Sequence, residues 1–312
     1  MRLRLTAALA AACLLPAAAQ EGKDLLPRAR RIVFLGDSIT YSGAYVAFFD
    51  AWLSATNPGG RHEVLNLGLP SETVSGLSEE GHAGGKFPRP DLAERLARVL
   101  AGTKPDLVVA CYGMNCGIYL PLDEGRFAKY REGIARLEKA VREAGARIVF
   151  VTPPAFDGAR HKPPLPDYDR VLGAYGEWLL SKRSEGWSVV DLHGPMAAEI
   201  AARREKDPAF TFQKDGVHPD EAGHWFMARQ LIRHFGGAGA AGAESPKAMM
   251  EGLPGGPALL DPVRKRLEVL RDPWLARTGH TRPGIRKGLP FEQAEAKARD
   301  LTETIRKAVE GK

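Results

Sequence analysis

Five short apolar segments, each followed by a stretch with helical periodicity, constrain this chain more than any other feature of its sequence. The segments are Ile32–Leu35, Glu63–Leu67, Asp106–Cys111, Arg147–Val151 and Ser188–Leu192. Short apolar runs bounded by turn signals are typical of strands that are buried on both faces. Because they alternate with amphipathic helices, they predict βαβ units, a parallel sheet and therefore an α/β fold.

Six stretches with helical periodicity separate or follow these segments, at Ala44–Leu53, Asp91–Leu100, Gly125–Ala144, Asp167–Ser184, Pro195–Arg204 and Glu221–Phe235. Two longer loops run from Gly68 to Pro90 and from Pro153 to Pro166. Ligands of parallel sheets bind just beyond the carboxyl ends of the strands. The residues that follow each strand are therefore the first place to look for a functional site.

The first strand runs directly into Gly36-Asp37-Ser38, and a helical pattern begins near Ser42. A serine at a strand-to-helix turn exposes its hydroxyl, and the helix N-terminus offers backbone N–H groups to a developing negative charge. Ser38 is therefore a candidate nucleophile. The alternative is that Ser38 only caps the following helix, and this segment alone does not separate the two.

The segment Asp215-Gly216-Val217-His218-Pro219 stands just before the helix expected at Glu221–Phe235. An imidazole beside a carboxylate has its tautomer fixed and its cationic form stabilised, as a general base for a hydroxyl requires. His218 and Asp215 are therefore a candidate base and orienting acid. The alternatives are a surface histidine and a turn capped by the Asp215 side chain.

Two residues that follow the second and third strands could stabilise an oxyanion. Gly68 can present its backbone N–H with no side chain in the way, and Asn115 can donate from its amide. With the backbone N–H of Ser38 they would supply three donors to one tetrahedral oxygen. Singly, Gly68 is equally well explained as a turn residue and Asn115 as a residue that caps a loop.

Four short motifs, taken together, resemble the sequence blocks of the SGNH hydrolases, also called GDSL esterases and lipases. They are GDSIT at 36–40, NLG at 66–68, YGMN at 112–115 and DGVHP at 215–219, and their order and approximate spacing agree with the family. The resemblance covers residues 31–235. It implies a flavodoxin-like, three-layer α/β/α sandwich around a five-stranded parallel sheet.

The resemblance also implies a role for each candidate residue. Ser38 would be the nucleophile, His218 the base and Asp215 its orienting acid. Ser38, Gly68 and Asn115 would form the oxyanion hole, and neither a metal ion nor an organic cofactor is expected. The implied reaction is the hydrolysis of carboxylic esters.

One position departs from the family pattern. Many members carry Asp after the Asn of the third motif, whereas this chain carries Cys116. The amide of Asn115 is still present, so we expect activity to survive. A thiol accepts backbone hydrogen bonds poorly, so this change is the feature that favours the rival hypothesis of a non-catalytic binding module. A disulfide between Cys116 and Cys111 depends on a geometry that the sequence does not give.

Within the loop from Gly68 to Pro90, three side chains could contact polar groups of a substrate: His82, Lys86 and Arg89. Their presence is explained equally well by a solvated surface loop with glycine hinges.

The first 19 residues have the pattern of a secretory signal peptide. Arg2 and Arg4 precede the apolar stretch Leu5–Leu15, and Ala17-Ala18-Ala19 offers a cleavage site. The alternative, an uncleaved anchor, is disfavoured because the apolar stretch is short for a membrane span. We therefore expect cleavage near Ala19 and export to the periplasm or the extracellular space.

The remaining chain divides by composition into a hydrolase domain at residues 28–236, a linker rich in Gly and Ala at 237–257 and a helical C-terminal extension at 258–312. In the extension, helices are expected at Asp261–Arg271 and Phe291–Glu310. No later segment is apolar enough to span a membrane.

The charge pattern narrows the class of partner. The chain has 44 Lys and Arg against 38 Asp and Glu, mixed throughout, with a net charge of +6. A mild and mixed excess does not indicate a nucleic-acid surface. We expect an exported serine esterase that removes acyl groups, such as acetyl, from a carbohydrate, so that its substrate is a small-molecule or polysaccharide ester. The alternatives are a lipase, a lysophospholipase, a thioesterase or a binding module with the same fold, and the oligomeric state stays open.

Overall fold

The computed structural model describes residues 22–59 and 62–311, so the expected signal peptide lies outside the described residues. Its centre is a five-stranded sheet with the order β2-β1-β3-β4-β5, in which every pairing is parallel. The strands are β1 (Arg31–Gly36), β2 (Glu63–Asn66), β3 (Leu107–Cys111), β4 (Arg147–Val151) and β5 (Ser188–Val190). The predicted parallel sheet is confirmed.

The strands form where the apolar runs lie because their side chains are buried on both faces of the sheet. Residues Ile32 to Leu35 of β1 have no exposed surface. The fifth strand ends two residues before the predicted Leu192. The backbone N–H groups of Leu192 and His193 both donate to the Thr152 hydroxyl, at 2.8 and 2.9 Å, instead of extending the sheet.

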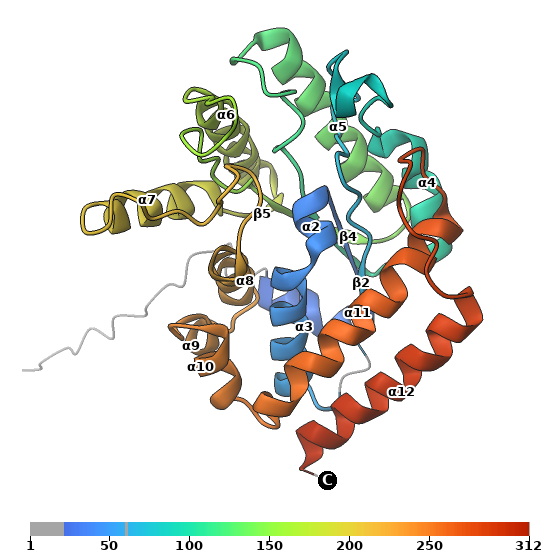
Figure 1. Ribbon diagram of the computed structural model, residues 1–312. Helices are drawn as coiled ribbons and strands as arrows, with labels where there is room; N and C mark the ends of the chain where they lie inside the picture. The colour runs from blue at the N-terminus through green and yellow to red at the C-terminus, as the bar shows by residue number, and fades with distance from the viewer. Residues whose placement is uncertain (1–21, 60–61, 312) are drawn as a thin grey trace, which may run out of the picture.

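Helices cover both faces of the sheet and form a three-layer sandwich (Figure 1). Helices α3 (Ala44–Thr56) and α8 (Glu221–His234) pack against each other on one face. Right-handed crossovers place α4 (Leu92–Thr103), α5 (Glu124–Glu143) and α6 (Tyr168–Ser181) on the other, with α7 (His193–Arg204) beside α6. The predicted α/β/α architecture is confirmed. Shorter helical turns are α2 (Ser38–Ser42), η1 (Leu26–Arg28), η2 (His82–Gly85) and η3 (Lys182–Glu185).

Aromatic packing fixes the end of β1 against these helices. The ring of Phe34 meets those of Tyr45 and Phe49 edge-on, with centroids 5.8 and 5.6 Å apart. Phe48 meets Trp225 of α8 at 5.8 Å. Offset and edge-to-face pairs of this kind add to the free energy of burial, so the strand end that precedes Ser38 rests on a rigid core.

The segment expected to be a linker, residues 237–257, contains two short helices, α9 (Ala238–Ala241) and α10 (Pro246–Glu251). Ala241, Met249 and Met250 are buried, and α9 and α10 pack on α8 and on α11. The composition favours a linker because it is rich in Gly and Ala, but small side chains also allow close packing of a helix on its neighbours.

The C-terminal extension consists mainly of α11 (Gly256–Thr278) and α12 (Phe291–Glu310). The second helix has the predicted bounds, whereas the first is longer than predicted at both ends. Its pattern is interrupted by Pro262 and Pro273, which normally break a helix. Both prolines are buried, and the helix continues past them along α3 and β2. Figure 1 shows the pair of helices along one side of the sandwich. Within the described residues, none of the helices meets the length and apolarity needed to cross a bilayer.

Candidate active site

Ser38 is the first residue of α2 and follows β1 with one residue between them. Asp37 caps the helix, because its Oδ1 accepts the N–H of Ile39 at 2.9 Å. The alternative in which Ser38 is the cap is therefore wrong. Gly36 is required in this turn, since a Cβ there would lie 2.1 Å from Thr40 Oγ1. The turn leaves the Ser38 hydroxyl half-buried and turned away from the helix backbone.

The structure brings Ser38 together with His218 and Asp215, although 180 residues separate the first two. Ser38 Oγ lies 2.8 Å from His218 Nε2, and His218 Nδ1 lies 2.6 Å from Asp215 Oδ2. The other oxygen of Asp215 accepts the backbone N–H groups of Val217 and His218, at 2.9 and 2.8 Å. The carboxylate is thus fixed by its own loop before it orients the imidazole.

The electrostatics of the Asp215 carboxyl agree with that role. Partial burial acts to raise its pKa, but hydrogen bonds from the His218 ring and from the backbone N–H groups of His218 and Val217 lower it overall. Asp215 is therefore ionised at neutral pH and can stabilise a cationic imidazole. The side chains of His218 and Asp215 are 49% and 56% exposed, so the site opens directly onto solvent.

The capping residue Asp37 is electrostatically different. It is buried, and burial raises its pKa to about 6, against the opposing effects of the Ile39 N–H and of His218. The pKa of Asp37 is therefore raised and that of Asp215 is lowered relative to the ordinary value of an aspartate.

Asn115 lies buried in the loop after β3, with both ends of its carboxamide held. Its Oδ1 accepts the Tyr119 hydroxyl at 3.2 Å, and its Nδ2 donates to the carbonyl of Glu72 at 3.3 Å. One amide hydrogen is left for another acceptor. Ile118 and Tyr119 both have left-handed backbone angles, with φ of 49° and 58°, so this loop holds strain of the kind found at functional sites.

The structure gives Gly68 a role different from the predicted one. Its N–H donates to Asn66 Oδ1 at 3.0 Å, and Asn66 Nδ2 donates in turn to the Thr40 carbonyl at 2.6 Å. A Cβ on Gly68 would lie 2.4 Å from the backbone nitrogen of Tyr41. Gly68 is therefore needed for the close approach of this strand end to α2, and its N–H is already engaged.

A backbone donor better placed for an oxyanion follows three residues later. Ser71 has a φ of 69° in the turn closed by the hydrogen bond from Glu72 N to the Leu69 carbonyl, 3.1 Å long. In the described part of the chain the Ser71 N–H has no hydrogen-bond partner. The carbonyl of Glu72 holds Asn115, so the turn lies beside the amide. Pro70, a frequent residue at this turn position, is the one sequence signal that could have revealed it.

A buried ionic network around Glu72 stabilises the turn that contains Ser71. Glu72 accepts Arg95 Nε and Nη2 at 2.6 and 2.7 Å and the Tyr112 hydroxyl at 2.6 Å. Arg95 also donates to the Leu67 carbonyl at 2.8 Å. Burial raises the pKa of Glu72, and the charge of Arg95 offsets part of this effect. Both carboxylate oxygens of Glu72 have donors, whereas Arg95 Nη1 is buried without a hydrogen-bond partner among the described residues. The pair fixes the loop that follows β2 through Glu72 and the Leu67 carbonyl.

Cys116, the departure from the family pattern, is fully buried. Its Sγ accepts the Val74 N–H at 3.5 Å, and its carbonyl accepts the Ser75 hydroxyl at 3.0 Å. Burial raises the pKa of the thiol to about 12, so it is neutral. The Ser75 hydroxyl therefore bonds the backbone at this position, and the Val74 N–H is the donor that the thiol accepts. Cys116 and Cys111 are both free thiols, and no disulfide joins them.

The three substrate candidates of the 68–90 loop lie in different environments. Arg89 is buried, pairs with both oxygens of Glu79 at 2.6 Å and stands 5.3 Å from the centre of the Tyr119 ring. The ring of His82 lies 3.3 Å from a Glu79 oxygen. Lys86 is exposed. Arg89 therefore holds the loop against Tyr119, whereas Lys86 is free to meet solvent or a ligand.

Within residues 22–59 and 62–311, no group of three or more His, Cys, Asp and Glu side chains could hold a metal ion. A hydroxyl bound to an imidazole that is itself bound to a carboxylate can carry out nucleophilic acyl transfer. The same hydroxyl, imidazole and carboxylate arrangement occurs on unrelated folds. It therefore indicates acyl transfer as the reaction but does not identify the substrate.

We compared the chain with known protein families and solved structures. The sequence model of the GDSL-like lipase/acylhydrolase family matches residues 34–226. The chain is similar in structure to a gut microbial diltiazem-metabolizing enzyme, with a TM-score of 0.54 and 24% identity over 66% of this chain. It spans 47% of that protein, or about half its length.

A second similar structure is a mutant of an acetyl-xylooligosaccharide esterase from Geobacillus stearothermophilus. Its TM-score is 0.50 and its identity 24%, over 66% of this chain and 94% of that one. At this identity the two solved structures show a shared fold. A comparison with curated proteins gave no match.

Proposed function

The chain belongs to the GDSL-like lipase/acylhydrolase family, whose members are carboxylic ester hydrolases, and on this basis we propose that it is an exported serine esterase that deacetylates carbohydrate. The observation that carries the proposal is the continuous hydrogen-bonded series from Ser38 Oγ through the His218 ring to Asp215. No other serine in the described residues has a histidine that is held by a carboxylate in this way.

In the proposed mechanism, His218 Nε2 removes the proton of Ser38 as Oγ attacks the ester carbonyl. Asp215 keeps the hydrogen of the ring on Nδ1 and stabilises the imidazolium that forms. The imidazolium then gives its proton to the oxygen of the departing alcohol, which leaves an acylated Ser38. Water, activated by the same imidazole, attacks the acyl group and releases the acid.

Three donors would stabilise the tetrahedral intermediate. They are the backbone N–H of Ser38 in the first turn of α2, the remaining amide hydrogen of Asn115 and the N–H of Ser71, in place of Gly68. Donors that are held in position before the reaction cost no reorganisation when negative charge develops. The positive end of the short α2 dipole adds to this effect only weakly.

The open site supports a polar, bulky alcohol and a short acyl group. His218 and Asp215 are about half exposed, so a sugar residue within a longer chain can reach Ser38 without entering a closed channel. The acetyl-xylooligosaccharide esterase has the same fold, so the fold accommodates such a substrate. A lipase, lysophospholipase or thioesterase would instead need an apolar channel for a long acyl chain.

Export rests on the pattern of residues 1–19. Mass spectrometry of the protein recovered from its native host would test this part of the proposal. We expect an N-terminus at Gln20, and a chain that keeps Met1 or Arg2 would contradict it.

The central experiment compares hydrolysis of p-nitrophenyl acetate, p-nitrophenyl octanoate and acetylated xylooligosaccharides by purified protein. Ser38→Ala should remove nearly all activity, and Asn115→Ala should lower kcat about 10²–10³-fold, as loss of one oxyanion donor does elsewhere. Ser42→Ala is the matched control. Ser42, in the same helix, lies 2.9 Å from His224 Nε2, but the other ring nitrogen of His224 has no partner among the described residues, so no carboxylate there orients the ring.

Equal rates for Ser38→Ala and the wild-type protein would end the esterase proposal and favour a binding module. A higher kcat/KM for the octanoate than for either acetate would contradict the choice of a carbohydrate acetyl ester and favour a lipase.

A further inference from the structure

The loop between α11 and α12 carries positive charge without compensating acids. Residues 279–290 contain Arg282, Arg286 and Lys287 but no Asp or Glu, and Arg277 precedes them in the last turn of α11. A stretch of this kind on a surface attracts anions unless neighbouring carboxylates neutralise it.

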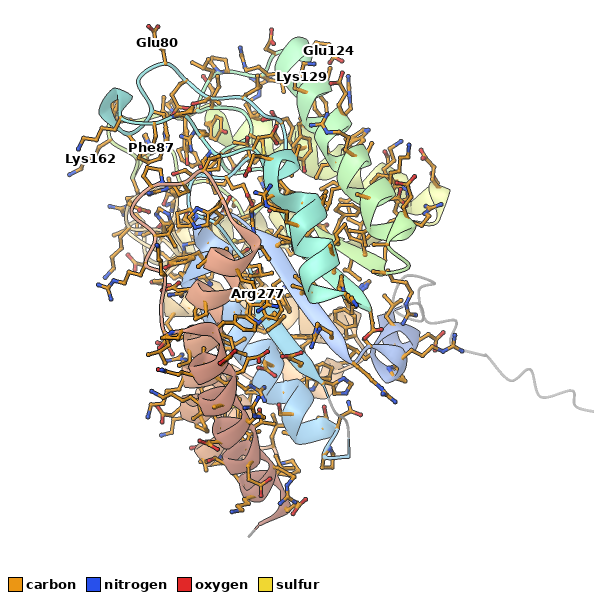
Figure 2. All side chains as sticks on the ribbon, turned by 90° about the vertical axis from the view of Figure 1, so that its right-hand side faces the viewer. Glu80, Phe87, Glu124, Lys129, Lys162 and Arg277 are labelled. Carbon is orange, nitrogen blue, oxygen red and sulfur yellow. The ribbon has the colours of Figure 1, made fainter. Side chains whose placement is uncertain are left out.

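The loop reaches the loop that follows β2, which borders the active site. The guanidinium of Arg282 lies 4.6 Å from the centre of the Phe87 ring. Phe87 belongs to the same 68–90 loop as the Ser71 turn and Arg89. In Figure 2 Phe87 stands beside the upper end of the C-terminal segment, whereas Arg277 lies farther down on α11.

The same extension also contacts the helix of the nucleophile. Arg271 donates to the Tyr41 carbonyl at 2.8 Å and covers the Tyr41 ring at 3.8 Å, and the Tyr41 hydroxyl donates to Asp272 at 3.0 Å. Tyr41 stands three residues after Ser38 in α2. The extension therefore contacts both elements that border the active site, α2 through Arg271 and Asp272 and the 68–90 loop through Arg282.

Among the described residues Arg282, like Arg277 and Arg286, has no counter-ion, and of these three it is the one that contacts the 68–90 loop. Arg89, Arg95 and Arg271 each pair with a carboxylate. Among the described residues Arg282 has no ion pair, and its hydrogen bond goes to the neighbouring Pro283 carbonyl. Its Nε is buried without a partner. The contact with the Phe87 ring holds the guanidinium against the 68–90 loop and leaves N–H groups that a ligand could accept.

Next to Phe87, Lys86 is exposed and also has no ion pair among the described residues. We propose that Arg282, assisted by Lys86, is an anion-binding subsite at the rim of the active site, and that the substrate is an acetyl ester of a carboxylate-bearing carbohydrate, such as a polymer of uronic acid residues. The inference rests on the proposed esterase function and gives the substrate class. A guanidinium matches a carboxylate through two parallel hydrogen bonds, so a uronate next to the esterified sugar is the group that fits it best.

The kinetic test uses acetylated oligogalacturonates and the same oligomers after methyl esterification of their carboxylates. Arg282→Gln should lower kcat/KM for the anionic oligomer about tenfold, mainly through KM, as expected for one charge-assisted contact in partial contact with water. It should change kcat/KM for the neutral oligomer less than about twofold. The wild-type preference for the anionic oligomer should also fall as the salt concentration rises, because screening weakens exposed charge pairs.

Arg277→Gln is the matched control, since it removes the same charge from the same extension. Arg277 stacks on Phe291, with its guanidinium 4.2 Å from the ring centre, and not on the 68–90 loop. It should leave both rates unchanged. If Arg282→Gln lowers both rates by the same factor, or neither, or if Arg277→Gln has the same selective effect, the subsite proposal is wrong.

A binding measurement separates this proposal from the esterase proposal. In a Ser38→Ala background, calorimetry with unacetylated oligogalacturonate should show binding that Arg282→Gln weakens about tenfold. If this selective binding is found but the wild-type protein hydrolyses none of the esters, the proposed reaction is wrong and the subsite stands. Esterase activity in the wild-type protein with no binding difference in this background would overturn the subsite alone.

Discussion

At the scale of single residues, the Tyr119 hydroxyl has a defined effect on Asn115. It donates to Asn115 Oδ1, which fixes the direction of the amide N–H groups. Tyr119→Phe should therefore lower kcat about tenfold and leave KM almost unchanged, because an amide held only by the Glu72 carbonyl is oriented less firmly toward the transition state while substrate binding is unaffected. Steady-state kinetics with p-nitrophenyl acetate measures the two constants separately.

Tyr175→Phe is the control for this substitution. Tyr175 is buried and stacks on Tyr130 with ring centres 4.0 Å apart, but its hydroxyl has no hydrogen-bond partner in the described residues. It should leave kcat unchanged. A fall in kcat of the same size in both variants, or a rise in KM for Tyr119→Phe with kcat unchanged, would show that the hydroxyl does not act through Asn115.

The residues that the sequence reveals and those that it hides differ in how their positions are set. Ser38 and Asp215–His218 are predictable because each lies in a short contiguous motif whose local turn places the side chain. Ser71 and Tyr119 are not, because both depend on left-handed backbone angles that non-glycine residues adopt only when the surrounding structure requires it. The sequence predicts Gly68 as an oxyanion donor because it has no side chain. In the structure, the absence of a side chain instead allows this strand end to pack closely against α2.

At the scale of elements, α8 carries two buried histidines that should make the fold sensitive to acid. Burial lowers the pKa of His224 and of His234 to about 4 in each case. In the unfolded chain a histidine titrates near 6.5, so both groups bind protons more readily after unfolding. The stabilisation that comes from keeping them neutral is present above pH 6.5 and is lost as the pH falls toward 4.

Between pH 7 and pH 5, each of the two histidines should account for a loss of about 2 kcal/mol in the free energy of unfolding. Urea unfolding at the two pH values measures this loss. The double variant His224→Gln, His234→Gln should lose correspondingly less than the wild-type protein over the same interval. Asp37, whose raised pKa gives a contribution of opposite sign, is common to both proteins and cancels in the comparison. An identical pH dependence in both would contradict the prediction.

Strands were more predictable than the helices of the extension, for a physical reason. A buried parallel strand is a short apolar run whose limits are visible in the sequence, and β1 and β4 have almost the predicted bounds. Helix α11 contains two prolines that normally end a helix, so its pattern predicts the middle part alone. Packing against α3 and β2 outweighs that local preference, and no local pattern reports such packing.

At the scale of the whole molecule, the extension is joined to the sandwich through a buried core of its own. Leu259, Val263 and Leu275 of α11 have no exposed surface. Arg266 donates from Nη2 to both carboxylate oxygens of Asp50 in α3, at 2.8 Å each, and from Nη1 to Thr302 of α12 at 3.2 Å. The expected division into a hydrolase domain, a linker and an extension is a prediction from composition, and these contacts favour a chain that unfolds as one unit.

The Arg266–Asp50 pair provides a test of whether the sandwich and the extension unfold together. Their side chains are 6% and 1% exposed, so removing one partner leaves the other charge buried and unpaired. Arg266→Met should lower the free energy of unfolding by about 3 kcal/mol, and Arg266→Met with Asp50→Leu should recover most of the loss, because no unpaired charge remains. Urea unfolding followed by tryptophan fluorescence and by circular dichroism should give coincident single transitions in all three proteins. If Arg266→Met instead produces a first transition in which α11 and α12 separate while esterase activity persists, the extension is an independent unit, and the contacts of Arg271 and Arg282 with the active-site rim are not needed for hydrolysis.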